Sequence, residues 1–88
     1  MNKELICRLI GKYSWQGQVI LCVEEMAELQ KELIKNLRGK NNETCIAEEI
    51  ADVEIMLEQL RYIFGDIDSK IKEYKEIKIE RIKKILED

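Results

Sequence analysis

The sequence predicts an all-α protein, a helical bundle of three long helices and one short helix built on an antiparallel helix hairpin. Apolar residues recur every three or four positions along most of the chain, which is the period of one helix face. Proline is absent and only four glycines occur, so few residues interrupt a helix. With 45% hydrophobic and 38% charged residues, the 88 residues are expected to form a single globular domain, 1–88.

The first half of the chain predicts a short helix, a break and a long helix. A short apolar stripe indicates a helix over 2–11, and the glycine-flanked segment GKYSWQG at 11–17 reads as a break. The following helix, 17–37, carries apolar residues at helical spacing: Val19, Cys22, Val23, Met26, Leu29, Leu33 and Leu37. Residues 38–42 then form the clearest loop, in which Gly39 suits a left-handed helix stop.

The second half predicts two more long helices. Asn42 or Thr44 suits the N-cap of the first, which has apolar residues spaced 4-3-4-3-4, as regular as a coiled-coil seam: Ile46, Ile50, Val53, Leu57, Leu60 and Phe64. Residues 65–68 end this helix, and a Lys/Glu-rich helix follows over 68–87. Because the 38–42 loop is short, the helices on either side of it should form an antiparallel hairpin.

Composition excludes several classes of protein. Histidine is absent, which removes Ser-His-Asp and Cys-His catalysis and histidine-ligated metal sites. Three cysteines without a CxxC pair argue against a disulfide scaffold and favour reduced thiols in the cytoplasm. No apolar run reaches the roughly 20 residues of a membrane span, and the start, MNKELICRLIGK, does not read as a signal peptide. A chain this short barely builds a stable core, so oligomerisation should complete the fold.

Charge is unevenly distributed along the chain. The net charge is −3, but residues 24–64 hold ten acidic and five basic residues, whereas the flanking segments are positive or neutral. A protein that binds a nucleic-acid polymer usually shows a clear basic surplus, which this chain lacks. The excess of acidic residues at 24–64 is therefore the feature of the sequence that a functional interpretation must explain.

Two acidic blocks account for much of this excess. EEMAE at 24–28 and EEIAD at 48–52 each place two carboxylates three residues apart on one helix face, Glu25 with Glu28 and Glu49 with Asp52. Facing residues of an antiparallel hairpin have a constant index sum, and both 25 with 52 and 28 with 49 give 77. That sum centres the hairpin inside the 38–42 loop, so all four carboxylates should lie at one level of the bundle.

Four neighbouring carboxylates cannot all stay ionised unless cations bind between them or some become protonated. An all-oxygen ligand set favours a hard divalent ion, Mg²⁺ or alternatively Mn²⁺, and Mg²⁺ commonly recruits phosphate oxygens of a substrate. The competing interpretation is an ordinary solvated helix face, because glutamate is the commonest exposed helix residue.

The EEMAE and EIAD blocks, separated by 20 residues, resemble the EExxE…ExxD signature of the MazG-like all-α nucleoside triphosphate pyrophosphohydrolases. The resemblance covers roughly residues 15–82. It implies that Glu25, Glu28, Glu49 and Asp52 bind Mg²⁺, and that the enzyme converts an NTP or dNTP to the monophosphate and pyrophosphate. It also implies a homodimer or homotetramer, with helices from more than one subunit around the nucleotide.

Further residues are candidates on the same resemblance. Trp15 and Gln18 stand where relatives often carry an aromatic residue and a glutamine near the base, and Lys78 with Arg81 resembles a phosphate-binding K-x-x-R. Glu24 is a candidate base for the attacking water, an outer ligand-positioning group or a solvated residue. The alternative for Trp15 is that it packs the first helix onto the bundle. The alternative for Lys78 and Arg81 is that they belong to a solvated face of the last helix.

The sequence therefore predicts a cytoplasmic, Mg²⁺-dependent nucleotide pyrophosphohydrolase with Glu24 and Glu25 as catalytic candidates. One alternative is a non-enzymatic helical oligomerisation or interaction module, for which the 46–64 seam and the 68–88 surface are suited. The other is a relative that binds nucleotides without hydrolysing them.

Overall fold

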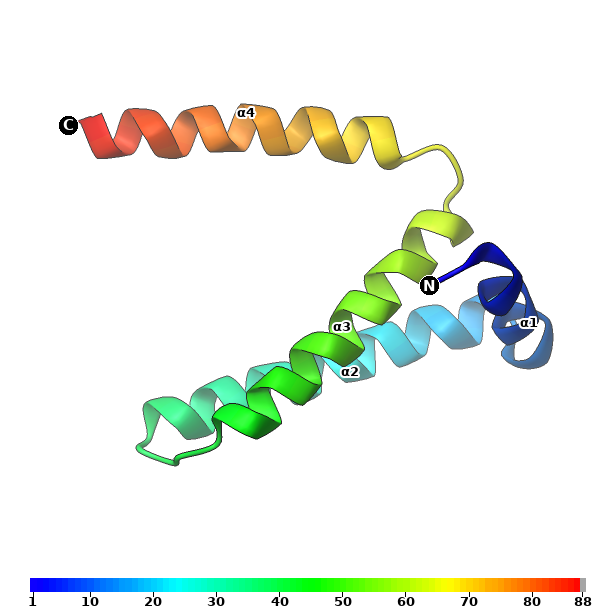
Figure 1. Ribbon diagram of the computed structural model, residues 1–88, viewed down its shortest axis with the longest axis horizontal. Helices are drawn as coiled ribbons and strands as arrows, with labels where there is room; N and C mark the ends of the chain where they lie inside the picture. Colours follow the sequence, from blue (N-terminus) through cyan, green and yellow to red (C-terminus); the bar gives the residue numbers. More distant parts are fainter. Residues whose placement is uncertain (88) are drawn as a thin grey trace.

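The computed structural model describes residues 1–87 and folds them into four α-helices, with no strand in that range (Figure 1). They are α1 (Lys3–Tyr13), α2 (Trp15–Leu37), α3 (Glu43–Ile63) and α4 (Asp68–Glu87). The prediction of an all-α fold with one short and three long helices is confirmed. None of the described helices is both long enough and apolar enough to cross a membrane.

Helices α2 and α3 pack side by side as an antiparallel hairpin, and they form the main helix contact of the chain (Figure 1). Gly39 has a φ of 99°, a left-handed conformation in which glycine avoids the strain of a side chain. Its N–H donates to the Asn36 carbonyl over 2.9 Å, so the turn ends α2 as the sequence predicts.

Asn42 occupies the N-cap position of α3, but its side chain makes no capping hydrogen bond. Instead its Nδ2 donates to the backbone carbonyl of Glu32 over 2.9 Å and to the Glu32 carboxylate over 2.6 Å. These bonds lower the pKa of Glu32 below its ordinary value. The residue predicted as a cap therefore ties the loop back to α2, which holds the two helices in register.

The predicted break at 11–17 is wrong in extent, because only Ser14 leaves the helical conformation. Ser14 has a φ of 71°; its N–H donates to the Ile10 carbonyl, which ends α1, and its Oγ accepts from the Gly17 N–H, which begins α2. One residue thus satisfies backbone groups at both helix ends, so Gly11 and Gly17 remain helical.

The core of the chain is small. Its buried apolar side chains are Ile6, Cys22 and Met56, and two glutamines, Gln18 and Gln59, are buried with them. All five come from α1, α2 and α3, which pack against one another. A core of this size is consistent with a fold that needs further contacts to be stable.

The regular apolar seam of α3 is only partly turned toward α2. Of its residues, Ile46, Val53 and Leu60 are half-buried, whereas Ile50, Leu57 and Phe64 are exposed. The other buried or half-buried side chains of α3 lie on a neighbouring face: Glu49, Asp52, Met56, Gln59 and Ile63. At 100° per residue the centres of the two faces differ by roughly 100°. Hydrophobic periodicity identified the helix correctly, but only one edge of the predicted seam lies on the face that contacts α2.

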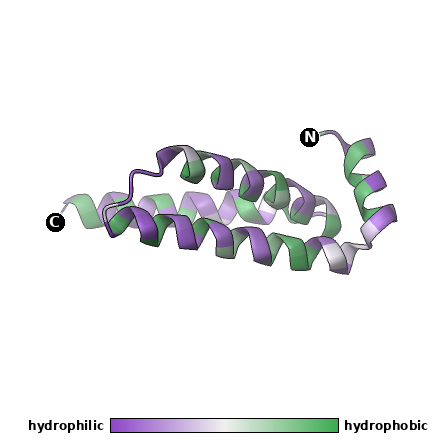
Figure 2. Ribbon diagram, turned by 90° about the horizontal axis from the view of Figure 1, so that it is seen from below, coloured by the Kyte–Doolittle hydropathy of each residue, from purple (hydrophilic) through white to green (hydrophobic). Residues whose placement is uncertain are grey.

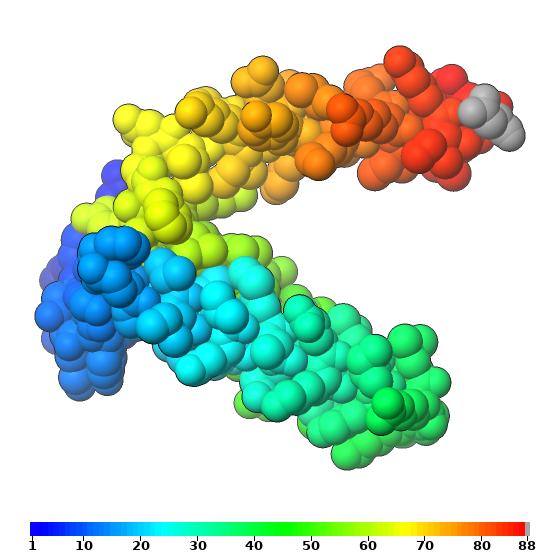
Figure 3. All heavy atoms as spheres, turned by 180° about the vertical axis from the view of Figure 1, so that it is seen from behind, coloured from blue at the N-terminus to red at the C-terminus, as the bar shows by residue number. Residues whose placement is uncertain are grey.

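Helix α4 stands apart from the rest of the chain. None of its residues is buried, and it does not join the bundle that α1, α2 and α3 form (Figure 1). The space-filling view shows an open wedge between α4 and the hairpin (Figure 3). The radius of gyration is 16.2 Å, against about 12 Å for a compact chain of this length. Within one chain, only α1, α2 and α3 form a bundle.

Candidate metal centre

Three of the four predicted carboxylates meet between α2 and α3. Glu25 from α2 and Glu49 and Asp52 from α3 each place an oxygen within 4.8 Å of the others, and all three side chains are half-buried. Glu49 and Asp52 reach the same point because residues three apart share a helix face. The loop geometry set by Gly39 and Asn42 then brings Glu25 opposite them.

Glu28, the fourth predicted ligand, lies outside this group of three. Its side chain is exposed, and its Oε1 accepts from the Lys31 ammonium over 3.3 Å. Its charge nevertheless raises the pKa of both Glu25 and Glu49, so it lies close to the cluster. It is placed at the edge of the site rather than between the helices.

The electrostatics of the cluster are unfavourable without a counter-charge. Partial burial and then the neighbouring carboxyl of Asp52 raise the pKa of Glu25. Burial, followed by the charges of Asp52 and Glu25, raises the pKa of Glu49. Oε2 of Glu49 is also fully buried and has no hydrogen-bond partner. A buried carboxylate oxygen without a hydrogen-bond partner lowers the stability of the folded state. Such oxygens are therefore rare in native proteins unless another group, such as a cation, satisfies them.

The donor set fits a hard divalent cation. Three carboxylates on two facing helices offer only oxygen ligands, which suit Mg²⁺ or Mn²⁺ rather than the sulfur and nitrogen ligands of zinc. A cation here would satisfy the Glu49 oxygen and offset the repulsion that raises both pKa values. Protonation of one carboxyl is the other way to relieve the same repulsion.

Two open cavities lie along the hairpin near the other candidates. Glu24 is exposed and lines a cavity of about 440 Å³ between α1 and α2, together with Tyr13, Gln18 and Leu21. Trp15 lines a separate cavity of about 390 Å³ with Tyr62 and Phe64. Trp15 and Gln18, both predicted to lie near a base, therefore line different cavities although they are three residues apart on α2.

Gln18 is buried and bonded inside the hairpin. Only 3% of its surface is exposed, and its Nε2 donates to Gln59 Oε1 over 2.6 Å. Nε2 of Gln59 in turn lies 3.6 Å from the Met56 sulfur. This orients the Gln18 amide nitrogen toward α3, so any contact of Gln18 with a ligand would come from its carbonyl oxygen.

We expect Gln59→Met to lower the free energy of unfolding by about 1–3 kcal/mol, because it leaves the buried Gln18 amide nitrogen without its acceptor. The double variant Gln18→Met/Gln59→Met removes both polar groups at similar volume and should recover much of that loss. Urea unfolding of the wild type, both single variants and the double variant measures the coupling. If the losses of unfolding free energy in the two single variants simply add in the double variant, the two glutamines do not act as a pair.

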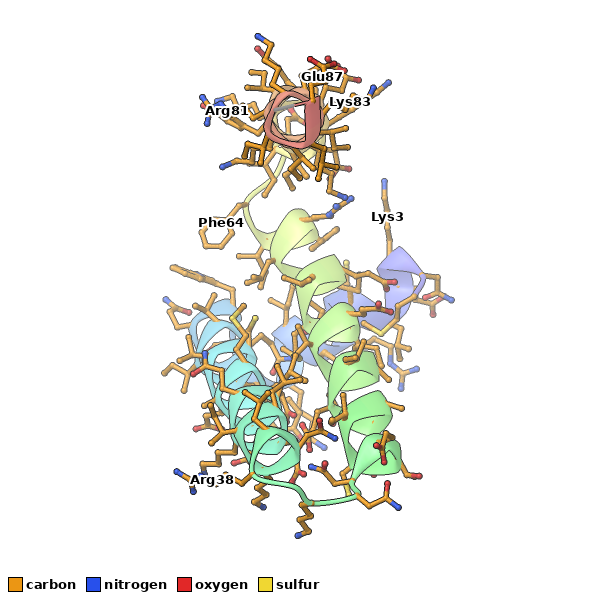
Figure 4. All side chains as sticks on the ribbon, turned by 90° about the vertical axis from the view of Figure 1, so that its left-hand side faces the viewer. Lys3, Arg38, Phe64, Arg81, Lys83 and Glu87 are labelled. Carbon is orange, nitrogen blue, oxygen red and sulfur yellow. The ribbon has the colours of Figure 1, made fainter. Side chains whose placement is uncertain are left out.

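Lys78 and Arg81 are exposed on α4, which lies apart from the α2–α3 hairpin (Figure 4). Within one chain no extensive contact joins α4 to α2, and neither residue forms an ion pair with the three carboxylates among residues 1–87. A role for them in phosphate binding remains a prediction.

Gln59 was missed by the sequence analysis, although a signal for it exists. Positions 18 and 59 have the same index sum, 77, as 25 and 52, so one register places both pairs opposite each other. A glutamine in a helix is usually exposed, and only the pairing of two at matched positions indicates a buried hydrogen bond.

Comparisons with protein-family models, with curated proteins and with solved structures find no significant match to this chain. The geometry of the site and the resemblance of its two acidic blocks are therefore what indicates a function for this chain.

Proposed function

We propose that this chain is a cytoplasmic, Mg²⁺-dependent nucleoside triphosphate pyrophosphohydrolase, which converts an NTP or dNTP to the monophosphate and pyrophosphate. The observation that carries the proposal is the group formed by Glu25, Glu49 and Asp52 across the hairpin, with a buried, unpartnered oxygen on Glu49. A cluster of three carboxylates lowers the stability of the fold unless a cation is bound. A protein that serves only as an interaction module has no need for such a cluster.

Glu25, Glu49 and Asp52 would hold the ion, and Glu28, at the edge of the cluster, is the candidate further ligand if it leaves Lys31. When bound, Mg²⁺ supplies charge neutralisation for the phosphates and lowers the pKa of a water molecule. In the reaction a water oxygen bonds to the α-phosphorus, and the bond from that phosphorus to the bridging oxygen of the β-phosphate breaks. Glu24, exposed beside Glu25, is the candidate to accept the water proton.

The cavity lined by Tyr13, Gln18 and Glu24 is the candidate place for the base or sugar, because Glu24 immediately precedes Glu25 of the acidic cluster on α2. Tyr13 offers a ring for stacking, and the Gln18 carbonyl offers an acceptor. Trp15 lies in the other cavity and is a weaker candidate for base contact.

A pyrophosphate-release assay over the common NTPs and dNTPs, with Mg²⁺ and with EDTA, tests this proposal. We expect release of pyrophosphate, not phosphate, from at least one nucleotide, and its complete loss in EDTA. Binding of a Mg²⁺–nucleotide without release would indicate an inactive relative. Neither release nor a thermal shift with Mg²⁺ would contradict the metal site and favour the interaction module.

A further inference from the structure

The cavity between α1 and α2 is lined mostly by groups that do not donate a hydrogen bond. Its apolar side chains are Leu9, Ile20 and Leu21. The Glu24 carboxylate only accepts when it is ionised. Gly17 also lines the cavity, but its N–H already donates to Ser14 Oγ over 3.1 Å. Apart from the Tyr13 hydroxyl, the Gln18 amide therefore decides whether the cavity offers a donor.

Gln59 fixes the orientation of the Gln18 amide. Nε2 of Gln18 donates to Oε1 of Gln59 over 2.6 Å, and the two residues are only 3% and 2% exposed. Figure 2 shows hydrophobic residues recurring along α2 and α3, the helices that carry this pair, so a buried amide nitrogen has few other acceptors. Because a buried donor without an acceptor weakens the fold, the Gln18 nitrogen is held toward α3.

The other end of the Gln18 amide, its carbonyl oxygen, remains available. Oε1 of Gln18 accepts no hydrogen bond from residues 1–87, and this atom is not fully buried. Because Gln18 lines the cavity, the carbonyl oxygen is the part of the amide that a ligand there can reach. The cavity therefore presents an acceptor at this point, and not a donor.

Met56 determines which of the two amides donates. Nε2 of Gln59 lies 3.6 Å from the Met56 sulfur, which accepts a hydrogen bond weakly but cannot donate one. If both amides rotated by half a turn, the Gln59 carbonyl oxygen would face that sulfur, and two acceptors form no hydrogen bond. The reversed pair, in which Gln59 donates to Gln18, is therefore disfavoured. Only that reversed pair would leave the Gln18 nitrogen free as a donor for the cavity.

A fixed acceptor distinguishes between the edges of nucleotide bases. The exocyclic amino group of cytosine or adenine carries two N–H donors and no acceptor of its own. Uracil and hypoxanthine carry a carbonyl oxygen at the same ring position, and two facing acceptors leave each other without a hydrogen bond. A site that forms a hydrogen bond with the correct base therefore rejects the base that lacks the donor.

We propose that Gln59, oriented by Met56, is a positioning residue that keeps the Gln18 carbonyl oxygen as a fixed acceptor in this cavity. The cavity then favours nucleotides whose base carries an exocyclic amino group over nucleotides with a carbonyl oxygen at the same position. This inference rests on the proposed function, because it assigns the cavity to a nucleotide base.

Scalar coupling across the hydrogen bond, measured by NMR on ¹³C,¹⁵N-labelled protein, tests the orientation of the pair without a ligand. In the wild type we expect coupling from Gln18 Nε2 to the side-chain carbonyl carbon of Gln59. Met56→Leu nearly keeps the volume of the side chain but removes the sulfur, so the reverse coupling should appear beside it. Met26→Leu, a half-buried methionine of α2, is the matched control and should change nothing. Reverse coupling in the wild type would overturn the proposal.

Titration with nucleoside monophosphates in Mg²⁺ tests the preference for amino-bearing bases. The wild type should bind CMP at least about 10-fold more tightly than UMP, and AMP more tightly than IMP by a similar factor. In Met56→Leu each ratio should fall below about threefold, since the amide pair can reverse. In Gln59→Met the Gln18 amide is free to rotate, so the ratios should approach one.

The ratio separates positioning from a structural defect, because partial unfolding weakens the binding of both nucleotides of a pair alike. Equal affinities in the wild type, or ratios that both variants retain, would overturn the proposal. Binding of a monophosphate requires no hydrolysis. A failure to release pyrophosphate would therefore contradict the proposed function, whereas these ratios alone decide the role of Gln59.

Discussion

The Glu25→Gln variant is expected to lose Mg²⁺-dependent pyrophosphate release by at least about 100-fold, because it removes one of three anionic oxygens that meet between α2 and α3. The substitution keeps the shape of the side chain, which is half-buried, so the helix content should not change. Steady-state release at saturating Mg²⁺ measures the activity, and circular dichroism measures the helix content.

Glu48→Gln provides the matched control for this loss. Glu48 is an exposed neighbour of Glu49 and does not belong to the group of three, so its amide should retain near wild-type turnover. Glu28→Gln should fall between the two, since Glu28 stands at the edge of the cluster and pairs with Lys31. Full activity in Glu25→Gln would remove the metal site from consideration.

The second large effect concerns stability, which should respond to pH and Mg²⁺ through the same cluster. In the folded protein the pKa values of Glu25 and Glu49 are raised above the ordinary 4.5. A raised pKa means that the folded state binds the proton more tightly than the unfolded state does. The contribution of the two protonated carboxyl groups to the free energy of unfolding is therefore fully present below pH 4.5. That contribution is lost as the pH rises through the folded pKa values.

In EDTA, the wild type should therefore lose unfolding free energy relative to Glu49→Gln as the pH increases from about 4.5 toward neutrality. Mg²⁺ at neutral pH should reverse this loss and stabilise the wild type by about 2.7 kcal/mol at a hundredfold excess over its Kd. Urea unfolding with and without Mg²⁺ in both proteins measures both effects. Identical pH profiles for the two proteins, together with no response to Mg²⁺, would show that the carboxylates neither repel nor bind a cation.

The arrangement of the site could be predicted only in part. One index sum, 77, brings Glu25 to Asp52 because antiparallel helices joined by a short loop have a single register. The same sum places Gln18 beside Gln59, a pair that hydrophobic patterns do not indicate. Glu28 is left at the edge, because its exposed side chain pairs with Lys31 on its own helix. Register determines the level of a residue, whereas the rotation of each helix determines whether its side chain points inward.

The sequence was sufficient for the features that depend on neighbouring residues. The four helices, the loop at 38–42 and the left-handed Gly39 follow from local spacing and turn chemistry. Three features required the tertiary structure: the face of α3 that meets α2, the burial of the Glu49 oxygen, and the isolation of α4. Each depends on how whole helices rotate and pack, which is set by contacts between residues far apart in the chain.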